Sequence, residues 1–494
     1  MTQQYPLFIN GEFIATDRKQ PVINPADSTV IAEVSVARKE EIELALAAGR
    51  NAFDKGEWPG ISLASRKEFL LKIAKGILDN AGELAKLETL NTGKPIKEST
   101  FMDLPSAAKA FEHFARNLEK YLQEESLELE NAKSILTRRP QGLVALIVPW
   151  NYPLLIACWK MAQGLAAGNT VILKPSSLTP LTTLELGKII AGIGLPKGVV
   201  NIINAAGQDI GQLLCADKRL DMISFTGSNT AGKEIINYAS CNVKKLVMEL
   251  GGKSAALVLK DADLELAVNG SLCSIFLNQG QMCTGMSRIL VQEQIYDKFI
   301  ASFIEKTKRI KSGNGLDYQT QMGPLISEAQ RKKVMGYVQR AQEEGAKLLC
   351  GGRIPASPEL KKGFFFEPAV LGGVSEEMSI FKEEVFGPVA CVTKFSGIEQ
   401  GLRLANSSDF GLAACIWTKD MPYARELAAK INAGTVWINT YGMFYNELPY
   451  GGFKQSGFGK ELGREGFLEY TRLQNIFLDD TKDSKPLVNY WYGF

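Results

Sequence analysis

Short apolar runs recur along the middle of the chain at a spacing that favours a parallel sheet. The runs are TVILKP (170–175), GVVNII (198–203), DMISFTG (221–227) and KKLVMEL (244–250), and each is separated from the next by enough residues for a helix. Runs of this length and composition predict buried strands. Their alternation with helices predicts a doubly wound parallel sheet, whose ligands bind beyond the carboxyl ends of the strands.

The segments around this region extend the same α/β pattern. Residues 39–121 carry the periodicity of helices, and a second mixed series runs from about 254 to 445. The stretch 143–159, LVALIVPWNYPLLIACW, is nearly as long as a membrane span, but its middle is interrupted by Pro149, Asn151 and Pro153. It predicts a buried strand, a turn and a helix beginning near Pro153, because proline is favoured in the first helical turn.

The composition favours a cytoplasmic protein that binds a small molecule. The 494 residues include 56 Lys and Arg against 54 Asp and Glu, a net charge of +2, so neither nucleic acid nor an anionic membrane is an expected partner. The eight cysteines lack the paired spacings of a zinc site or a disulfide framework. The N-terminus, MTQQYPLFINGEF, lacks the pattern of a secretory signal. We therefore expect no metal and a cytoplasmic location.

The segment SFTGSNTAGKEI is the first candidate for nucleotide binding. Gly227 ends a predicted strand, and Gly232 lies at the start of a predicted helix, whose free amide groups and dipole suit a pyrophosphate. A full G-x-G-x-x-G fingerprint is absent. The segment also approaches a P-loop, but Glu234 stands where that motif requires a hydroxyl for magnesium. A P-loop-like hydrolase and an ordinary strand-to-helix turn are the alternatives.

KPSS, residues 174–177, directly follows the strand predicted at 170–175. In a dinucleotide fold this is where the adenosine ribose binds, and NAD-selective sites often place a carboxylate there. The position is Ser177, which is neutral, and Lys174 lies nearby. A 2′-phosphate would not be repelled, so both NAD and NADP are admissible cofactors.

Cys283 lies in FLNQGQMCTG, among small and amide-bearing residues. A free thiol has a pKa of about 8.5 and needs a base, a cation or a helix terminus to become a nucleophile at neutral pH. The single histidine, His113, lies in a polar helical stretch and is expected to be structural. Glu249 ends a predicted buried strand and is followed by Gly251 and Gly252, so it is the candidate base, with a capping or surface carboxylate as the alternative.

These motifs together resemble the NAD(P)-dependent aldehyde dehydrogenase superfamily over essentially the whole chain. FLNQGQMC matches its nucleophile motif, MELGGKS its general-base motif, PWNYP its amide motif, KPS its cofactor-lysine motif and EEVFGP (383–388) a further cofactor motif, all in the family's order. The chain most resembles the betaine-aldehyde and aminoaldehyde branch.

The resemblance implies an aldehyde dehydrogenase-like α/β fold with two doubly wound parallel-sheet domains and a small β oligomerisation domain. The implied coenzyme-binding domain comprises 1–122 and 141–251, with 447–465 returning to it. The catalytic domain would be 252–446, and 123–140 with 466–494 would form the oligomerisation domain.

The resemblance also implies a reaction, the oxidation of an aldehyde to its acid. Cys283 would attack the carbonyl, and the side-chain amide of Asn151 with the backbone N–H of Cys283 would hold the oxyanion. Hydride transfer to NAD(P) would leave a thioester, which water activated by Glu249 would hydrolyse. Lys160 and Glu461 match a pair that relays protons in the family, although an ordinary internal ion pair is an equal alternative.

The cofactor residues follow from the same motifs. Glu384 matches a contact to the nicotinamide ribose, Phe386 a residue near the nicotinamide, and Ser228 a contact to the pyrophosphate. The complete set of expected cofactor-binding residues is Trp150, Lys174, Ser176, Ser177, Gly227, Ser228, Gly232, Glu384 and Phe386.

The sequence allows two interpretations of the substrate. Tyr152, Trp159, Phe444 and Tyr450 match the family's aromatic substrate tunnel, and such rings bind a quaternary ammonium through cation–π attraction. Leu277, however, stands where betaine-aldehyde enzymes commonly add another ring. The substrate is therefore either betaine aldehyde or an aminoaldehyde, or a broad range of aliphatic and aromatic aldehydes.

Two segments suggest self-association. Residues 124–139 (EESLELENAKSILTRR) alternate like an exposed β-hairpin, and the tail 487–494 (LVNYWYGF) is too apolar for a solvated terminus. By resemblance they pair between subunits of a homodimer or a homotetramer. A catalytically silent relative is a further alternative, and the presence of Cys283, Glu249 and Asn151 argues against it.

Overall fold

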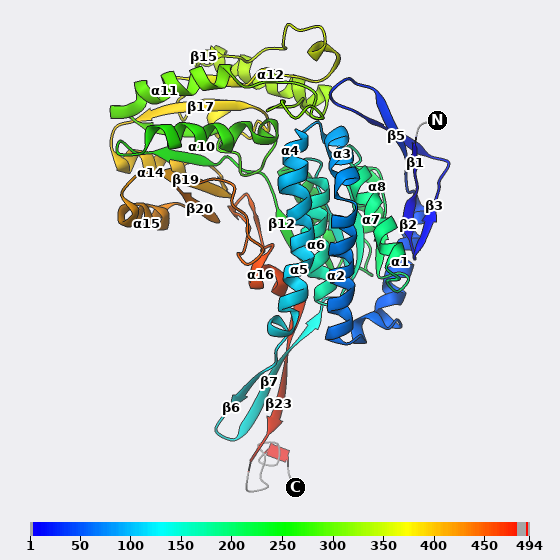
Figure 1. The fold of residues 1–494 in the computed structure, drawn as a ribbon. Helices are drawn as coiled ribbons and strands as arrows, with labels where there is room; N and C mark the ends of the chain where they lie inside the picture. The colour runs from blue at the N-terminus through cyan, green and yellow to red at the C-terminus, as the bar shows by residue number, and fades with distance from the viewer. Residues whose placement is uncertain (1–2, 482–490, 493–494) are drawn as a thin grey trace.

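The computed structural model describes residues 3–481 and 491–492, and its centre is a mostly parallel sheet of eight strands (Figure 1). The five inner strands, β12 to β10, run parallel, whereas β22, β2 and β3 join antiparallel at the edges. The order is β22 (Gly457–Phe458), β12 (Lys245–Glu249), β11 (Met222–Thr226), β8 (Leu143–Ile147), β9 (Thr170–Lys174), β10 (Val200–Ile202), β2 (Leu7–Ile9) and β3 (Glu12–Ile14). The four predicted strands are thus confirmed, in one sheet.

Helices cover both faces of this sheet, as its uninterrupted apolar strands require. Successive residues of β8 alternate between two cores: Val144 and Leu146 pack in one, Leu143 and Ala145 in the other. The first core contains α2 (Leu63–Asp79), α3 (Ala81–Thr92), α5 (Leu104–Tyr121), α6 (Pro153–Ala166) and α7 (Leu181–Gly192). The second contains α1 (Lys39–Asp54) and α9 (Asn229–Ala239). The helix predicted to begin near Pro153 is α6.

A second sheet of seven strands lies beside the first (Figure 1). Its order is β15 (Lys347–Cys350), β16 (Ala369–Gly372), β17 (Val389–Phe395), β14 (Arg288–Gln292), β13 (Ala255–Val258), β19 (Ala413–Trp417) and β20 (Thr435–Ile438), all parallel except β15. One face carries α10 (Leu264–Phe276) and α11 (Glu293–Lys308), the other α12 (Glu328–Glu343), α14 (Ile398–Asn406) and α15 (Met421–Lys430). Both sheets are therefore doubly wound.

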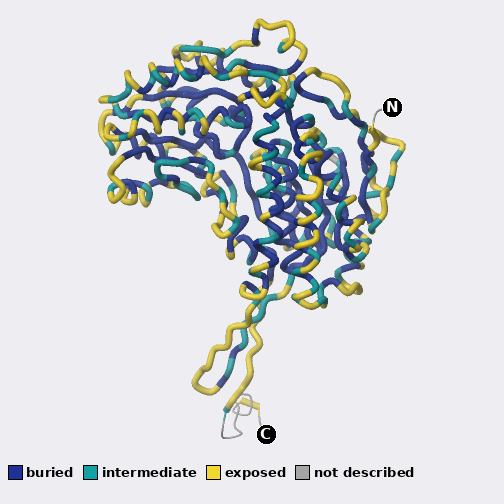
Figure 2. The backbone as a smooth tube through the Cα atoms, viewed as in Figure 1, coloured by how far each residue is buried: buried dark blue, intermediate teal, exposed yellow. Residues whose placement is uncertain are grey.

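A three-stranded antiparallel arm projects from the body (Figure 1). It consists of β6 (Glu125–Glu128), β7 (Ala132–Pro140) and β23 (Thr471–Asp479), so the hairpin predicted at 124–139 is confirmed. Much of the arm is exposed (Figure 2), including the apolar side chains of Leu473 and Phe477. The apolar tail at 487–494 lies outside the described residues except for 491–492.

The remaining elements are short. A small sheet that the sequence did not predict joins β1 (Gln3–Tyr5), β5 (Val30–Ser35) and β4 (Lys19–Ile23). The others are α4 (Ile96–Glu98), α8 (Gly207–Asp209), α13 (Ser379–Lys382), α16 (Gly463–Glu469), β18 (Phe410–Gly411) and β21 (Phe453–Lys454). Over 3–481 and 491–492, no helix combines the length and the apolar character needed to cross a membrane.

Candidate active site

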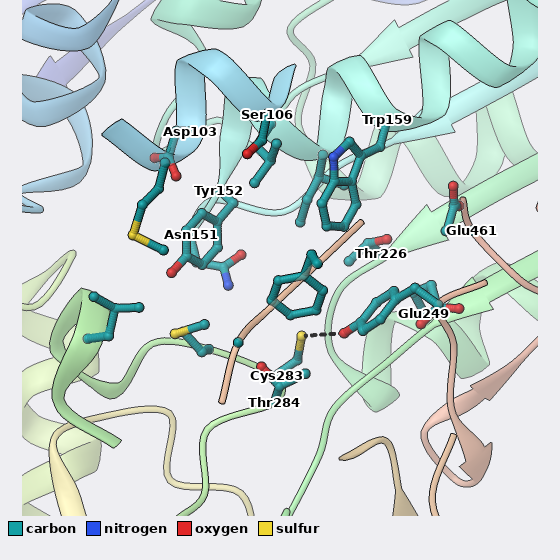
Figure 3. Close-up of a pocket in the computed structure, with 18 of the residues that line it drawn as sticks. Asp103, Ser106, Asn151, Tyr152, Trp159, Thr226, Glu249, Cys283, Thr284 and Glu461 are labelled. Atoms are coloured by element: carbon teal, nitrogen blue, oxygen red, sulfur yellow. Dashed lines mark hydrogen bonds between the residues drawn. The ribbon is translucent and has the colours of Figure 1, made fainter. Parts of the chain in front are cut away.

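A cavity of about 270 Å³ opens between the two domains that carry the large sheets, and most of the predicted catalytic and substrate residues line it, whereas none of the nine predicted cofactor-binding residues does (Figure 3). Four of the five predicted catalytic residues and all five predicted substrate residues are in its wall, namely Asn151, Glu249, Cys283 and Glu461 with Tyr152, Trp159, Leu277, Phe444 and Tyr450. Lys160 lies behind the wall, against Glu461. Residues separated by some 300 positions in the chain thus meet in one pocket.

The sheet order explains this convergence. Parallel neighbours end at the same edge, and β12, β11, β8 and β9 are consecutive in the sheet. Glu249 ends β12, Gly227 follows β11, and Lys174 ends β9. The turn after β8 carries Asn151, two residues before the start of α6 at Pro153. The carboxyl edge of one sheet therefore presents the base, the amide and the glycine and lysine of the expected cofactor site.

The chain reaches Cys283 through an unusual backbone turn after α10. Asn278, Gln279 and Gly280 have φ values of 46°, 57° and 68°, three left-handed residues in succession. For residues other than glycine this conformation costs about 1–2 kcal/mol each. A Cβ at Gly280 would lie 2.2 Å from the carbonyl oxygen of Gly387, so only glycine fits where the loop meets the EEVFGP segment. Such strain persists only where neighbouring contacts hold it.

Buried polar groups supply those contacts. The carboxylate of Glu98, at the end of α4, accepts the backbone N–H of Asn278 at 3.2 and 3.3 Å. The side-chain amide of Asn278 donates to the backbone carbonyls of Asn151 (3.1 Å) and Gln281 (3.3 Å). The turn is thereby tied both to a helix of the first domain and to the start of α6. Glu98 was not among the predicted site residues, and an isolated glutamate in a helical region gives no signal of this role.

Asn151 is held beside the nucleophile by the same loop. Its side-chain Nδ2 donates to the carbonyl oxygen of Gln281 at 2.9 Å, and the residue is buried. An amide nitrogen carries two hydrogens, so a second N–H remains for a group bound in the cavity. The arrangement suits the predicted oxyanion donor.

Cys283 is half-buried, and its sulfur lies 3.3 Å from the hydroxyl of Tyr450. Burial raises the pKa of the thiol to about 12, and the nearby carboxylates of Glu384 and Glu249 act in the same direction. The resting thiol is therefore protonated at neutral pH. His113 does not line the cavity; it is buried in α5, where its ring contacts the hydroxyl of Tyr121 at 3.2 Å, in agreement with a structural role.

Among the acidic residues of the cavity wall, Glu249 has the environment expected of a general base. It is 2% exposed, and in the described part of the chain neither carboxylate oxygen has a hydrogen-bond partner. Burial raises the pKa of Glu249 well above its ordinary value, and the carboxylate of Glu461 raises it further. The surface or capping alternative is excluded by this burial. A buried carboxylate without a protein partner, in the wall of a cavity, is poised to take a proton from water or a thiol.

Lys160 and Glu461 form a fully buried ion pair. Nζ of Lys160 lies 2.6 Å from Oε1 of Glu461, and the hydroxyl of Ser224 bridges them at 2.7 and 2.9 Å. Nε2 of Gln163 donates to the other carboxylate oxygen at 2.7 Å. The pair therefore exists, and a relay function remains a prediction. Ser224 and Gln163 were not predicted, although Lys160 and Gln163 are the two polar residues on one face of the otherwise apolar α6.

The expected cofactor residues fall into two groups at the carboxyl edge. On the ribose side, burial lowers the pKa of Lys174 to about 8, and the carbonyl of Ser177 accepts a hydrogen bond from Gln20. The Ser176 hydroxyl accepts the N–H of Leu178 at 3.3 Å. At the start of α9, the Ser228 hydroxyl caps the helix by accepting the N–H of Ala231 at 3.3 Å. Gly232 is buried against Leu250, where a Cβ would come within 2.6 Å.

In the second group, Glu384 and Phe386 precede β17 of the other sheet, and Trp150 follows β8. The Glu384 carboxylate accepts the N–H of Gly252 at 2.8 Å, and burial raises the pKa of Glu384 to about 6. A Cβ at Gly251 would lie 2.6 Å from Glu384, so the glycines after Glu249 allow this approach. The rings of Phe386 and Trp150 meet edge to face, with centroids 5.1 Å apart. A carboxylate acceptor and an aromatic pair suit the ribose and the ring of a nicotinamide dinucleotide.

An unpaired buried glutamate and the expected dinucleotide site lie at the carboxyl edge of a doubly wound sheet, and the loop after α10 places a cysteine in the same cavity as the glutamate. This arrangement defines a dehydrogenase that captures its substrate covalently. Residues 13–476 match the aldehyde dehydrogenase family, and the chain belongs to that family.

Related proteins cover nearly the whole chain. It is 45% identical to the betaine aldehyde dehydrogenase of Bacillus subtilis (strain 168), over 99% of each chain. It is 39% identical to retinaldehyde dehydrogenase 3 of Mus musculus, over 95% of this chain and 92% of that one. Among solved structures, betaine aldehyde dehydrogenase from Staphylococcus aureus in complex with NAD+ superposes with a TM-score of 0.95 at 40% identity, covering 99% of this chain and 97% of the other. These similarities confirm the predicted family and fold.

Proposed function

We propose that the protein oxidises an aldehyde to its carboxylic acid with NAD or NADP as the hydride acceptor. The observation that carries the proposal is the meeting of Cys283, Asn151 and Glu249 in one cavity. The thiol of Cys283 releases its proton to solvent, the sulfur bonds to the carbonyl carbon, and the carbonyl oxygen becomes an oxyanion. The free N–H of Asn151 and the backbone N–H of Cys283 hold that charge, and one such donor is typically worth about a hundred- to a thousandfold in rate.

A bound nicotinamide dinucleotide supplies the hydride acceptor. Glu384, Phe386 and Trp150 would hold its nicotinamide half, and Lys174, Ser176 and Ser177 its adenosine half. Ser228, with Gly227 and Gly232, would face the pyrophosphate at the start of α9. Loss of hydride leaves an acyl group on Cys283 as a thioester. Glu249 then takes a proton from water, which attacks the thioester and releases the acid. Lys160 and Glu461 would pass that proton away from Glu249.

The aromatic wall supports a cationic aldehyde as the substrate. Trp159, Phe444 and Tyr450 have ring centroids 5.5–6.1 Å apart, and Tyr152 lines the same cavity. We propose betaine aldehyde or an aminoaldehyde, the substrates named for several relatives, including an aminoaldehyde dehydrogenase of Pisum sativum. The second candidate is a broad range of aliphatic and aromatic aldehydes, favoured by Leu277 and Met282, which line the same cavity.

A matrix of substrates and cofactors tests the proposal. Betaine aldehyde, aminobutyraldehyde, a short aliphatic aldehyde and benzaldehyde would each be assayed with NAD and with NADP, following reduced cofactor. Cys283→Ala is the control and should be inactive throughout. A preference for the cationic aldehydes over the neutral ones supports the first candidate, and equal rates support the second. No reduced cofactor from any aldehyde with freshly reduced enzyme would refute aldehyde oxidation.

Three further proposals concern organisation. The division into 1–122 with 141–251 and 447–465, 252–446, and 123–140 with 466–494 is supported by the membership of the three main sheets, whose strands fall within those ranges. Assembly into a homodimer or homotetramer is supported by the exposed apolar side chains of the arm and by its two outer strand edges, which pair with no strand among the described residues. Light scattering of the purified protein would measure the subunit number. A cytoplasmic location is supported by eight free cysteines.

A further inference from the structure

Tyr450 is the one residue of the aromatic wall whose polar atom touches the nucleophile. Its hydroxyl lies 3.3 Å from the sulfur of Cys283, the contact drawn as a dashed line in Figure 3. The hydroxyl of Tyr152 and the indole N–H of Trp159, in the same wall, have no hydrogen-bond partner in the described chain. A ring that only lined the tunnel would not need a hydroxyl at this position.

The hydroxyl is fixed in place from two sides. The backbone of Tyr450 forms a bridge with Glu461, in which each N–H donates to the other's carbonyl at 2.7 Å. The ring packs against Phe444 and Trp159, with centroids 5.5 and 6.1 Å away at steep angles. The residue is buried. The ring therefore cannot swing away from the sulfur without disrupting the wall.

The chemistry of the two groups decides which one donates. A thiol and a phenol can each donate to the other, but a thiolate can only accept. We propose that Tyr450 is a catalytic residue whose hydroxyl donates a hydrogen bond to the Cys283 thiolate, stabilising the nucleophile before it attacks the aldehyde. This inference rests on the proposed covalent role of Cys283, and it assigns to Tyr450 a function beyond that of a substrate wall.

Few other groups in the site stabilise the thiolate of Cys283. The carboxylates of Glu384 and Glu249 oppose ionisation of the sulfur, as does burial. Tyr450 and the backbone N–H of Thr284 are the groups that favour it. The titratable groups that interact with Cys283 across the cavity are Tyr450, Glu384, Glu249, Tyr152 and Tyr441. None of them is a cation, so a neutral donor has to supply the stabilisation.

Tyr450→Phe isolates the hydroxyl because it keeps the ring. A hydrogen bond to a charged group corresponds to roughly one pKa unit or more. Its loss should raise the pKa of Cys283 by about one unit and lower the thiolate fraction about tenfold. The remaining thiolate becomes more nucleophilic, with a Brønsted coefficient of about 0.4–0.5, so the net rate of alkylation should fall about threefold to fourfold along the rising limb of the pH profile.

The test is alkylation by iodoacetamide without aldehyde, measured on the peptide containing Cys283 by mass spectrometry across a pH series. Tyr121→Phe is the matched control, because it removes a buried hydroxyl bonded to His113 outside the cavity and should leave the rate unchanged. Replacing Tyr450 by 3-fluorotyrosine, a stronger donor, should shift the rate in the opposite direction. Thermal unfolding would establish that each variant folds.

Alkylation of Tyr450→Phe as fast as the wild type, or faster, across the rising limb would overturn the proposal, as would a slower rate with 3-fluorotyrosine. If the hydroxyl acts as proposed, kcat/KM for aldehyde also falls, and its basic limb moves to higher pH, which the loss of a packing contact alone would not produce. Because alkylation needs no aldehyde, a wild type inactive on every aldehyde would refute the proposed function while leaving the role of Tyr450 decidable.

Discussion

Replacing Glu249 by glutamine should separate the two halves of the reaction. The carboxylate is 2% exposed and has no hydrogen-bond partner in the described residues, so an amide of the same shape leaves no cavity and breaks no bond. What it removes is the base. General-base catalysis is worth about 10²–10⁴ in rate. At about 1.4 kcal/mol per tenfold, the barrier to thioester hydrolysis should rise by about 3–5 kcal/mol.

The assay is rapid mixing of enzyme, cofactor and aldehyde while reduced cofactor is followed. We expect Glu249→Gln to give a burst of about one reduced cofactor per subunit, because capture and hydride loss precede the step that needs the base. The steady rate after the burst should fall a hundredfold or more. Acyl-enzyme should then be detectable as a mass increase on the peptide containing Cys283. A variant whose burst and steady rate fell by the same factor would show that Glu249 acts on the thiol instead.

Stability gives an independent check on the same residue. The pKa of Glu249 is raised by burial, so the folded protein retains a proton that the unfolded chain loses at about pH 4.3. Above that pH the folded state binds more protons, and stability contributed by this group falls as pH rises toward its folded pKa. Glu249→Gln should therefore unfold at the same temperature as the wild type near pH 4 and at a higher temperature near pH 8. A lower temperature at pH 8 would contradict the burial argument.

Three other substitutions probe the amide, the cofactor and the loop. Asn151→Ala should lower kcat about 10²–10³-fold with little change in KM, and an effect confined to KM would refute an oxyanion role. Ser177→Glu should reduce the ratio of kcat/KM with NADP to that with NAD about tenfold, since a carboxylate repels the 2′-phosphate; an unchanged ratio would place the ribose elsewhere. Gly280→Ala should lower the unfolding temperature more than Gly373→Ala, because both have similar positive φ but only Gly280 faces a carbonyl at 2.2 Å. If the two variants lost the same amount of unfolding temperature, the contact with the carbonyl of Gly387 would not be the cause of the loss at Gly280.

Strand positions and the nucleophile could be predicted because their signals are local. The runs at 170–175, 198–203, 221–227 and 244–250 are apolar on both faces, which is typical of strands covered on both sides. The small N-terminal sheet was missed because β1, β4 and β5 are short and partly exposed, with no apolar run to reveal them.

The supporting contacts of the site could not be predicted, because they depend on distant parts of the chain. Glu98 meets Asn278 across 180 residues, and Ser224 bridges Lys160, 64 residues before it, to Glu461, 237 residues after it. The sequence could predict that Tyr450 lines the aromatic wall, but it could not predict that the hydroxyl of Tyr450 contacts the sulfur of Cys283. Its direction is set by the bridge to Glu461, a long-range pairing that leaves no local pattern.

The wall of the cavity is built from two kinds of structure, and this difference governs how the protein can change. Trp159 and Lys160 lie on one buried helix, α6, and Asn151 and Tyr152 lie in the turn directly before it, so a substitution for substrate fit there would disturb the chemistry beside it. Gly442, Met443 and Phe444 of the wall belong to 439–449, a largely surface segment that forms neither helix nor strand. Irregular surface segments tolerate substitution and insertion far better than packed helices. New aldehyde preferences are therefore expected to evolve through substitutions in this segment, while the residues on α6 and in the turn before it stay constant.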